Sequence, residues 1–152
     1  MDKESRGGKT EETLIFLKPS ALSRGLVGEI LSVFERKGLE IVELKLTTMS
    51  KETAERLYSV HKGKPFFERL IDVVSGKKIV TAILRGENAI SVVRKMIGAT
   101  NPAEAEPGTI RGDYGLDITD NLIHASDSLE NYLYESKILF SDDEKTPNKS
   151  TA

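Results

Sequence analysis

Apolar and polar residues follow one another along this chain in blocks whose spacing predicts strands and helices in turn. Residues 13–18 form a short apolar run that is rich in strand-favouring side chains and is stopped by Pro19, which is typical of a central strand. Residues 26–34 carry apolar side chains at helical spacing, and Gly38 is placed to end this helix. The first part of the chain therefore predicts a strand, a turn and an amphipathic helix.

The middle of the chain continues with a second strand and two helices. Residues 42–47 alternate apolar and polar side chains, which predicts a half-buried strand whose inward side chains are Val42, Leu44 and Leu46. Residues 51–61 predict a helix with Leu57 and Val60 facing inward, and Pro65 is placed to open another helix. These two helices form a hairpin between the second and third strands.

The last part of the chain predicts two strands and two helices around a long loop. Residues 79–84 form a nearly continuous apolar strand, and residues 87–97 carry a helical apolar stripe. The segment 99–120 has little periodicity, and a loop of that length inside a compact domain is usually functional. A fourth strand begins at residues 122–123, and residues 127–130 resemble a capping box for a helix over 128–137.

This order of elements predicts one α+β domain of the βαββαβ type, in which helices cover a four-stranded sheet. The polar ends, residues 1–11 and 141–152, have no apolar anchor and are predicted to be mobile tails.

The composition excludes several classes of protein. The 152 residues, 38% hydrophobic and 30% charged, suit one soluble domain, and a net charge of −2 gives no bulk case for nucleic-acid or membrane binding. The absence of cysteine rules out disulfides and thiolate metal sites, and two histidines alone give no zinc spacing. No apolar run approaches the roughly 20 residues of a membrane span. We therefore expect a cytoplasmic protein.

The residues most suited to chemistry lie in the segment 121–128, Asn-Leu-Ile-His-Ala-Ser-Asp-Ser. An imidazole with a pKa of about 6.5 keeps one nitrogen neutral near neutral pH while a hydrogen bond holds the other, so His124 could accept a phosphoryl group. Taken without its neighbours, a lone histidine before a helix is more often structural than catalytic. The amide, hydroxyls and carboxylate around His124 favour the catalytic interpretation.

Phosphoryl transfer also needs positioned cations, because charge spreads over the oxygens of the moving group. Lys18, Arg94, Thr100 and Arg111 could supply the charge and hydrogen bonds, but only if the long loop folds back over the sheet. Taken singly, each basic residue is typical of a solvated surface. Arg111 is the strongest candidate, because nearby glycines allow close backbone approach and its guanidinium can bind two phosphate oxygens.

Several motifs together resemble one known family. Residues 121–127 match the pattern N-x-x-H-[GA]-S-D of nucleoside diphosphate kinases, and further matches follow the family's order at residues 18–19, 24–30, 65–67, 98–102 and 107–113. The resemblance covers residues 13–140 and implies a kinase domain over residues 12–140 with a ferredoxin-like antiparallel sheet. The chain departs from the family mainly at its C-terminus, which bears on assembly rather than on phosphate chemistry.

The resemblance implies an enzyme that moves the γ-phosphoryl group of a nucleoside triphosphate such as ATP to a nucleoside diphosphate such as GDP. The mechanism would be ping-pong, with His124 as the nucleophile. Glu135 would orient the imidazole, and Ser126 would hydrogen-bond to that carboxylate. The phosphates would be held and polarised by Lys18, Tyr58, Arg94, Thr100 and Arg111.

The same resemblance implies how the rest of the nucleotide binds. Lys18 and Asn121 would contact the sugar, and the base would stack on Phe66 in a slot completed by Leu70 and Ile118. No side chain there would recognise base edges, so purines and pyrimidines should both be accepted. From the residues alone, Phe66 and Phe67 could equally be two core aromatics, or one ring could face outward.

Magnesium would arrive on the nucleotide phosphates, with no metal site built from protein side chains. The resemblance also implies a homo-oligomer, a hexamer or alternatively a tetramer, with no need of nucleic acid or membrane.

Two expectations test this interpretation. Residues three apart in an ideal strand face opposite sides, so Asn121 and His124 share a pocket only if the strand begins after Asn121, which we predict. The alternative function is a non-catalytic nucleotide- or nucleic-acid-binding module on the same fold. Such a module would be expected to have lost at least one of the catalytic positions, and all of them are present.

Overall fold

The computed structural model describes residues 8–140, so most of the two predicted tails, residues 1–7 and 141–152, lies outside the described residues. Four strands form one antiparallel sheet in the order β2-β3-β1-β4. The strands are β1 (Thr10–Leu17), β2 (Glu40–Met49), β3 (Lys77–Glu87) and β4 (Ile123–Ala125). The predicted ferredoxin-like sheet is confirmed, and β1 begins three residues earlier than predicted.

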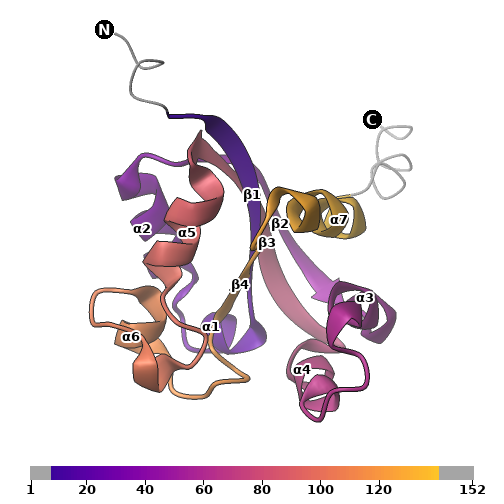
Figure 1. Cartoon of the computed structure of the whole chain (residues 1–152). Helices are drawn as coiled ribbons and strands as arrows, with labels where there is room; N and C mark the ends of the chain where they lie inside the picture. The colour runs from indigo at the N-terminus through magenta and orange to yellow at the C-terminus, as the bar shows by residue number, and fades with distance from the viewer. Residues whose placement is uncertain (1–7, 141–152) are drawn as a thin grey trace, which may run out of the picture.

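Helices cover both faces of this sheet (Figure 1). One face carries α1 (Pro19–Ser23), α2 (Val27–Lys37), α5 (Ala89–Ile97) and α6 (Ile110–Tyr114). The other face carries α3 (Lys51–Leu57), α4 (Phe67–Val74) and α7 (Leu129–Leu139). Short 3₁₀ turns, η2 (Ser59–His61) and η3 (Pro102–Glu104), lie in the connections.

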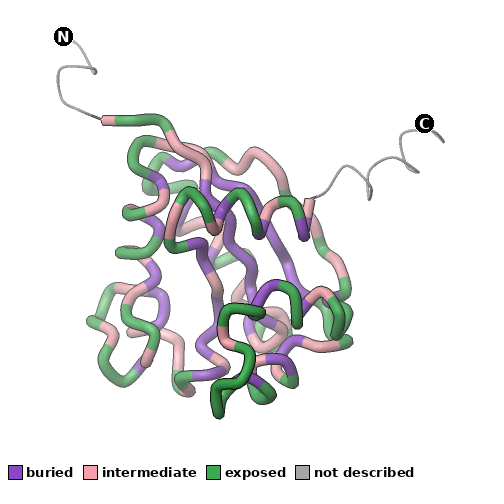
Figure 2. Tube along the Cα trace, turned by 45° about the vertical axis from the view of Figure 1, so that its right-hand side comes forward, coloured by how far each residue is buried: buried purple, intermediate pink, exposed green. Residues whose placement is uncertain are grey.

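The central strand β1 contributes to two separate cores because successive strand residues point to opposite faces. Ile15 and Leu17 pack with α2 and α5, whereas Leu14 and Phe16 pack with α3, α4 and α7. All four side chains are completely buried. Figure 2 shows the buried positions running along the strands inside the outer helices. Burial on both faces fixes the register of β1, because a shift of one residue would exchange the two cores.

The predicted helix at residues 26–34 is confirmed as α2, and Gly38 ends it in the left-handed conformation with φ 106°. The helix predicted over 51–61 is shorter. It ends at Leu57 and continues as the 3₁₀ turn η2, whose different period leaves Val60 73% exposed rather than inward. The next helix begins at Phe67 instead of Pro65, after a turn closed by the Phe67 N–H to the Lys64 carbonyl.

The buried face predicted for β2 is wrong at two of its three positions. Val42 packs against one core, but Leu44 and Leu46 are 54% and 60% exposed. A register shift between Ile41 and Glu43 inserts one residue, and a β-bulge of this kind reverses the alternation beyond it. β2 is also an edge strand, so two leucines lie exposed at one side of the sheet.

The long loop predicted at 99–120 contains two short helical segments, η3 and α6, and Thr109 caps α6 by accepting the Gly112 N–H. The cap of α7 also differs from the predicted box. Ser128 is the N-cap and accepts the Asn131 N–H. The segments η3 and α6 lie in the loop that leads to the start of β4, and Ser128 begins the helix that carries Glu135.

Candidate active site

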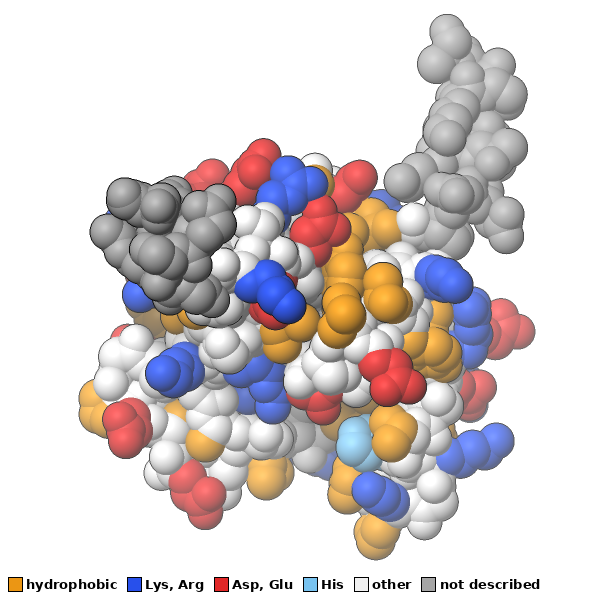
Figure 3. Space-filling view, turned by 45° about the horizontal axis from the view of Figure 1, so that its top comes forward, with side chains coloured by type: hydrophobic (Ala, Val, Ile, Leu, Met, Phe, Trp, Pro, Cys, Tyr) orange, Lys and Arg blue, Asp and Glu red, His pale blue; other side chains and the backbone are white. Residues whose placement is uncertain are grey.

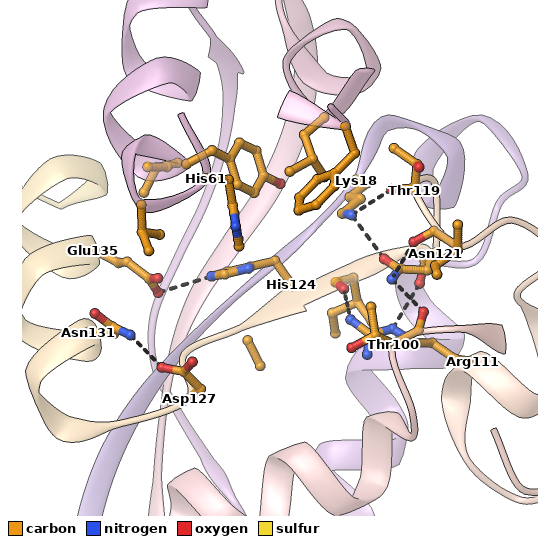
Figure 4. A pocket seen from close by; sticks show the side chains of 18 of the residues that line it. Lys18, His61, Thr100, Arg111, Thr119, Asn121, His124, Asp127, Asn131 and Glu135 are labelled. Atoms are coloured by element: carbon orange, nitrogen blue, oxygen red, sulfur yellow. Dashed lines mark hydrogen bonds and ion pairs between the residues drawn. The ribbon is translucent and has the colours of Figure 1, made fainter. Parts of the chain in front are cut away.

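A cavity of about 490 Å³ lies where β1 ends and β4 begins, between the α3–α4 hairpin, α7 and the loop that follows α5 (Figure 4). All but one of the side chains predicted for the site line it. These are Lys18, Tyr58, Phe66, Leu70, Arg94, Thr100, Arg111, Ile118, Asn121, His124 and Glu135. The remaining residue, Ser126, is buried and bonded to Glu135. The long loop therefore folds back over the sheet, as the convergence of these residues requires.

A tight turn before β4 turns two of these side chains to the same side. The Ile123 N–H donates to the Asn121 carbonyl at 3.0 Å, and Leu122 between them has φ 78°. This i to i+2 bond with a positive φ describes a classic γ-turn, a rare and strained conformation. β4 begins at Ile123, so the prediction that it starts after Asn121 is confirmed. Asn121 and His124 consequently both line the cavity.

His124 is held by ring contacts and by one carboxylate. Its ring stacks on Phe16, its partner on β1, with centroids 4.9 Å apart, and Tyr58 meets it edge-on at 6.3 Å. Nε2 lies 3.0 Å from Oε1 of Glu135, which also accepts the Ser126 hydroxyl at 2.6 Å. A carboxylate partner assigns the proton to Nε2, which leaves the lone pair on Nδ1.

Lys18 is a buried cation at the end of β1. Its ammonium donates to the Thr119 carbonyl at 3.0 Å and to Oδ1 of Asn121 at 2.9 Å. Burial, reinforced by the positive charge of Arg111, lowers the pKa of Lys18 to about 8. The same amide of Asn121 donates to the Thr100 and Ile118 carbonyls. Lys18 and Asn121 thus join the strand end to two parts of the loop.

Arg111 organises the backbone around the cavity. Its guanidinium donates to the carbonyls of Gly98, Asn121 and Ile123 at 3.0, 3.4 and 2.7 Å, using one N–H of each nitrogen. A second N–H on each terminal nitrogen is therefore available for a ligand. Burial, with Arg94 beside it, lowers the pKa of Arg111 to about 10. Arg94 donates to the Ala125 carbonyl at 3.1 Å, which places a second guanidinium at the cavity.

One of the two adjacent rings Phe66 and Phe67 faces outward and the other lies in the core, which is one of the two alternatives that the sequence left open. Phe67 is buried in the core, whereas Phe66 is 44% exposed and lines the cavity. Leu70 follows one helical turn later, and Ile118 comes from the loop on the opposite side. These three side chains form an apolar slot that is open at the surface, and its apolar character suits a flat aromatic ring.

His61 is a cavity residue that the sequence pattern missed. It ends η2, its ring centroid lies 5.3 Å from that of Phe66, and its buried Nδ1 has no hydrogen-bond partner among the described residues. Burial, followed by the charge of Lys64, lowers the pKa of His61. His61 follows Tyr58 by three residues, and residues at this spacing lie on one side of a 3₁₀ turn. This spacing could have indicated that His61 lines the same cavity as Tyr58.

The carboxylates at the cavity already have partners. Glu135 bonds to His124 and Ser126, and Asp127 accepts from Asn131. Within residues 8–140, no group of three metal-ligating side chains is present. The basic side chains at the cavity suit an anionic ligand. No helix in the same residues is long and apolar enough to cross a membrane.

Comparison with known proteins identifies a family. A sequence model described as nucleoside diphosphate kinase matches residues 11–145. The chain is 57% identical to a nucleoside diphosphate kinase of Hyperthermus butylicus over 134 residues, covering 88% of this chain and 94% of that protein. It is 54% identical to that of Methanocaldococcus jannaschii, covering 88% and 96% of the two chains.

Solved structures agree with this result. The nucleoside diphosphate kinase of Encephalitozoon cuniculi superposes with a TM-score of 0.85 at 39% identity, covering 88% of this chain and 90% of that one. The Halobacterium salinarum enzyme, solved in complex with CDP, superposes equally well at 38% identity, covering 90% and 91%. The match extends over nearly all of the described residues. This chain belongs to the nucleoside diphosphate kinase family.

Proposed function

We propose that this nucleoside diphosphate kinase transfers the γ-phosphoryl group by a ping-pong mechanism in which His124 is transiently phosphorylated on Nδ1. The observation that carries the proposal is the hydrogen bond between Nε2 of His124 and Glu135, because it occupies Nε2 and leaves the lone pair of Nδ1 free to attack phosphorus. An alternative nucleophile would need a comparable setting. His61, the only other histidine in the sequence, has no carboxylate hydrogen bond among the described residues.

In the first half-reaction, Nδ1 attacks the γ-phosphorus, a nitrogen–phosphorus bond forms, and the bond to the bridging β–γ oxygen breaks. The nucleoside diphosphate leaves with that electron pair. The imidazole becomes positively charged, and the carboxylate of Glu135 stabilises this charge through the Nε2 proton. In the second half-reaction, a terminal oxygen of another diphosphate attacks the same phosphorus, and the nitrogen–phosphorus bond breaks.

The cations around the cavity would stabilise the charge on the transferring group. Lys18, Arg94 and Arg111 lie on different elements but line one space. Lys18 and Arg111 are buried, which strengthens their interaction with phosphate, whereas Arg94 is exposed. The hydroxyl of Tyr58 is buried without a partner among the described residues, and burial raises the pKa of Tyr58. It therefore stays protonated and can donate to a phosphate oxygen. Thr100 would add a further contact.

The remainder of the nucleotide would extend from His124 towards the surface. Asn121 and Lys18 would contact the sugar, and the base would lie between Phe66 and Ile118 with Leu70 beside it. The His61 ring lies near both Phe66 and Tyr58, so its Nδ1, which has no partner among the described residues, could contact a phosphate or the sugar. Apolar contact with either side of a ring does not discriminate between bases, which supports a broad substrate range.

Magnesium is the expected cofactor. The cavity offers cations and carboxylates that are already bonded, which fits an ion bound to the nucleotide phosphates rather than to a protein cage. When bound, the ion would neutralise phosphate charge and hold the phosphates in one conformation.

Labelling with γ-³²P ATP and magnesium tests the mechanism directly. We expect the isolated protein to carry label that is labile to acid and stable to base, and added GDP should remove it as labelled GTP. A protein that binds ATP but takes up no label would contradict the mechanism and favour the non-catalytic binding module.

Replacing Glu135 with Gln should slow phosphorylation of His124 by about 10- to 100-fold, because the amide cannot neutralise the imidazolium. Rapid-quench measurement of the first half-reaction tests this. Glu130→Gln, an exposed position on the same helix, is the matched control and should retain the wild-type rate. Equal rates for both variants would contradict the role of Glu135.

The pH dependence of kcat/KM should be set on its alkaline side by Lys18. With its pKa lowered to about 8, the free enzyme loses this positive charge as the pH rises through 8, so kcat/KM should fall above that pH. The stability of the folded protein should instead increase over this alkaline range. Between about pH 8 and 10.5 the unfolded chain binds the proton that the folded Lys18 has lost, so this residue makes unfolding less favourable as pH rises.

Kinetic profiles and urea unfolding across this range measure both effects. In Lys18→Arg the charge persists, so the alkaline decrease in kcat/KM should move to higher pH. A profile that is unchanged in this variant would assign the decrease to another group.

The exposed edge strand β2 supports a proposed homo-oligomer, a hexamer or alternatively a tetramer. Leu44 and Leu46 lie exposed on a strand with one unpaired edge, a surface that a second copy could cover. Light scattering should show a smaller assembly for the double variant Leu44→Lys, Leu46→Lys than for wild type. An unchanged mass would exclude this edge as the contact.

We assign the kinase domain to residues 12–140, close to the family match over 11–145. A cytoplasmic location remains a prediction from the cysteine-free sequence.

A further inference from the structure

Two charged side chains connect the opposite sides of the apolar slot. Arg69 of α4 forms an ion pair and hydrogen bond with Asp117 in the loop before β4. Each partner directly precedes a residue of the slot, Leu70 on the helix and Ile118 on the loop. The pair therefore joins two sides that are 48 residues apart in the sequence.

Both partners are anchored to elements that the cavity already uses. Arg69 lies three residues after Phe66 and therefore on the same side of the helix. Oδ1 of Asp117 accepts the Thr119 N–H at 3.2 Å, and the Thr119 carbonyl in turn accepts the Lys18 ammonium. A change in the ion pair would therefore move Phe66 and Leu70 relative to Ile118, while Lys18 holds the loop at its other end.

The ion pair between Arg69 and Asp117 is the polar contact that joins α4 to the segment 115–119 in the described part of the chain. Across residues 8–140, no other hydrogen bond or ion pair between α4 and the segment 115–119 is present. The slot residues on the two sides are apolar, so they provide no directional contact of their own. The spacing of the two sides thus depends on packing and on this one ion pair.

We propose that Arg69 and Asp117 form a clasp that sets the width of the base slot and thereby controls how tightly the nucleotide base is held. This inference rests on the proposed function, in which Phe66, Leu70 and Ile118 bind the base. Arg69 and Asp117 are positioning residues, because they act through the slot and do not line the cavity themselves.

The exposure of the clasp limits its strength. The side chains of Arg69 and Asp117 are 60% and 40% exposed, so water and salt screen their attraction. We expect its loss to raise KM for nucleotides by about two- to fivefold, the range for an exposed ion pair, with little change in kcat. A weak clasp suits an enzyme that must release one nucleotide and bind the next at the same site in every cycle.

Steady-state kinetics of Arg69→Gln, Asp117→Asn and the double variant test the clasp. Each single variant should raise KM for ATP and GDP, and the double variant should be no worse than either single one. The charge reversal Arg69→Asp with Asp117→Arg should recover part of the loss. High salt should raise the wild-type KM towards that of the variants more than it raises theirs.

Asp72→Asn, a change of the same kind on the same helix, is the matched control and should leave KM unchanged. Calorimetry with magnesium pyrophosphate, which has no base, should give the same affinity in every variant. A uniform loss of pyrophosphate affinity would indicate general distortion and overturn the clasp.

Phe66→Ala separates failure of the clasp from failure of the slot. If Phe66→Ala raises KM while the Arg69 and Asp117 variants match wild type, the slot stands and the clasp is wrong. If none of the three changes KM, the assignment of the base slot itself fails, and the clasp fails with it.

Discussion

His124→Asn should abolish phosphoryl transfer and leave the protein folded. Removal of a covalent nucleophile reduces turnover on the order of 10⁶-fold, because the remaining groups only bind and polarise the substrate. The fold should persist, since Glu135 keeps its hydrogen bond to Ser126 and the core around Phe16 is otherwise unchanged. Coupled kinetics, labelling with γ-³²P ATP and urea unfolding measure the three properties.

His61→Asn is the matched control, because it makes the same change at the other cavity histidine. This variant should still take up label, with activity reduced by no more than about tenfold, as expected for loss of one substrate contact. If His124→Asn still carried acid-labile label, or if only His61→Asn lost the label, the assignment of His124 as the nucleophile would be wrong.

Arg111→Ala should reduce kcat/KM by about 10³-fold and destabilise the protein as well. Loss of one preorganised donor to a transition-state anion costs about 10²- to 10³-fold, and a guanidinium offers two such donors. The same substitution leaves the carbonyls of Gly98, Asn121 and Ile123 without their donor. We expect the free energy of unfolding to fall by about 2–4 kcal/mol, since each buried unpaired carbonyl costs about 1–3 kcal/mol and solvent can enter the space.

Arg94→Ala provides the comparison, because Arg94 contributes a similar charge but, within residues 8–140, donates to one backbone carbonyl, that of Ala125. It should lose activity with a smaller loss of stability. Arg111→Lys should keep the charge and still lose much of the activity, because an ammonium cannot reach the three carbonyls and a phosphate together. Equal unfolding free energies for Arg111→Ala and wild type would show that Arg111 does not organise the loop.

Elements with a strong local pattern could be predicted from the sequence. The central strand ended by Pro19 and the helix ended by Gly38 follow from spacing and backbone preference. The start of β4 after Asn121 was predicted differently, from the requirement that Asn121 and His124 share one pocket. Failures occurred where one local irregularity changed the period. The bulge at Val42 reversed the exposure of Leu44 and Leu46, and the 3₁₀ turn exposed Val60 and brought His61 into the cavity.

The sequence by itself determined which chemical groups the protein has, and it indicated the strand that carries His124 and the helix that carries Glu135. Only the tertiary structure decided that they converge. Lys18 meets Asn121 across 103 residues, and Arg69 meets Asp117 across 48. Such contacts depend on strand pairing and on burial of both faces of the sheet, which are non-local and leave no periodic signal in the segments concerned. The strained turn at Leu122 arises in the same way, because the packed core around it over-determines a conformation that leucine disfavours locally.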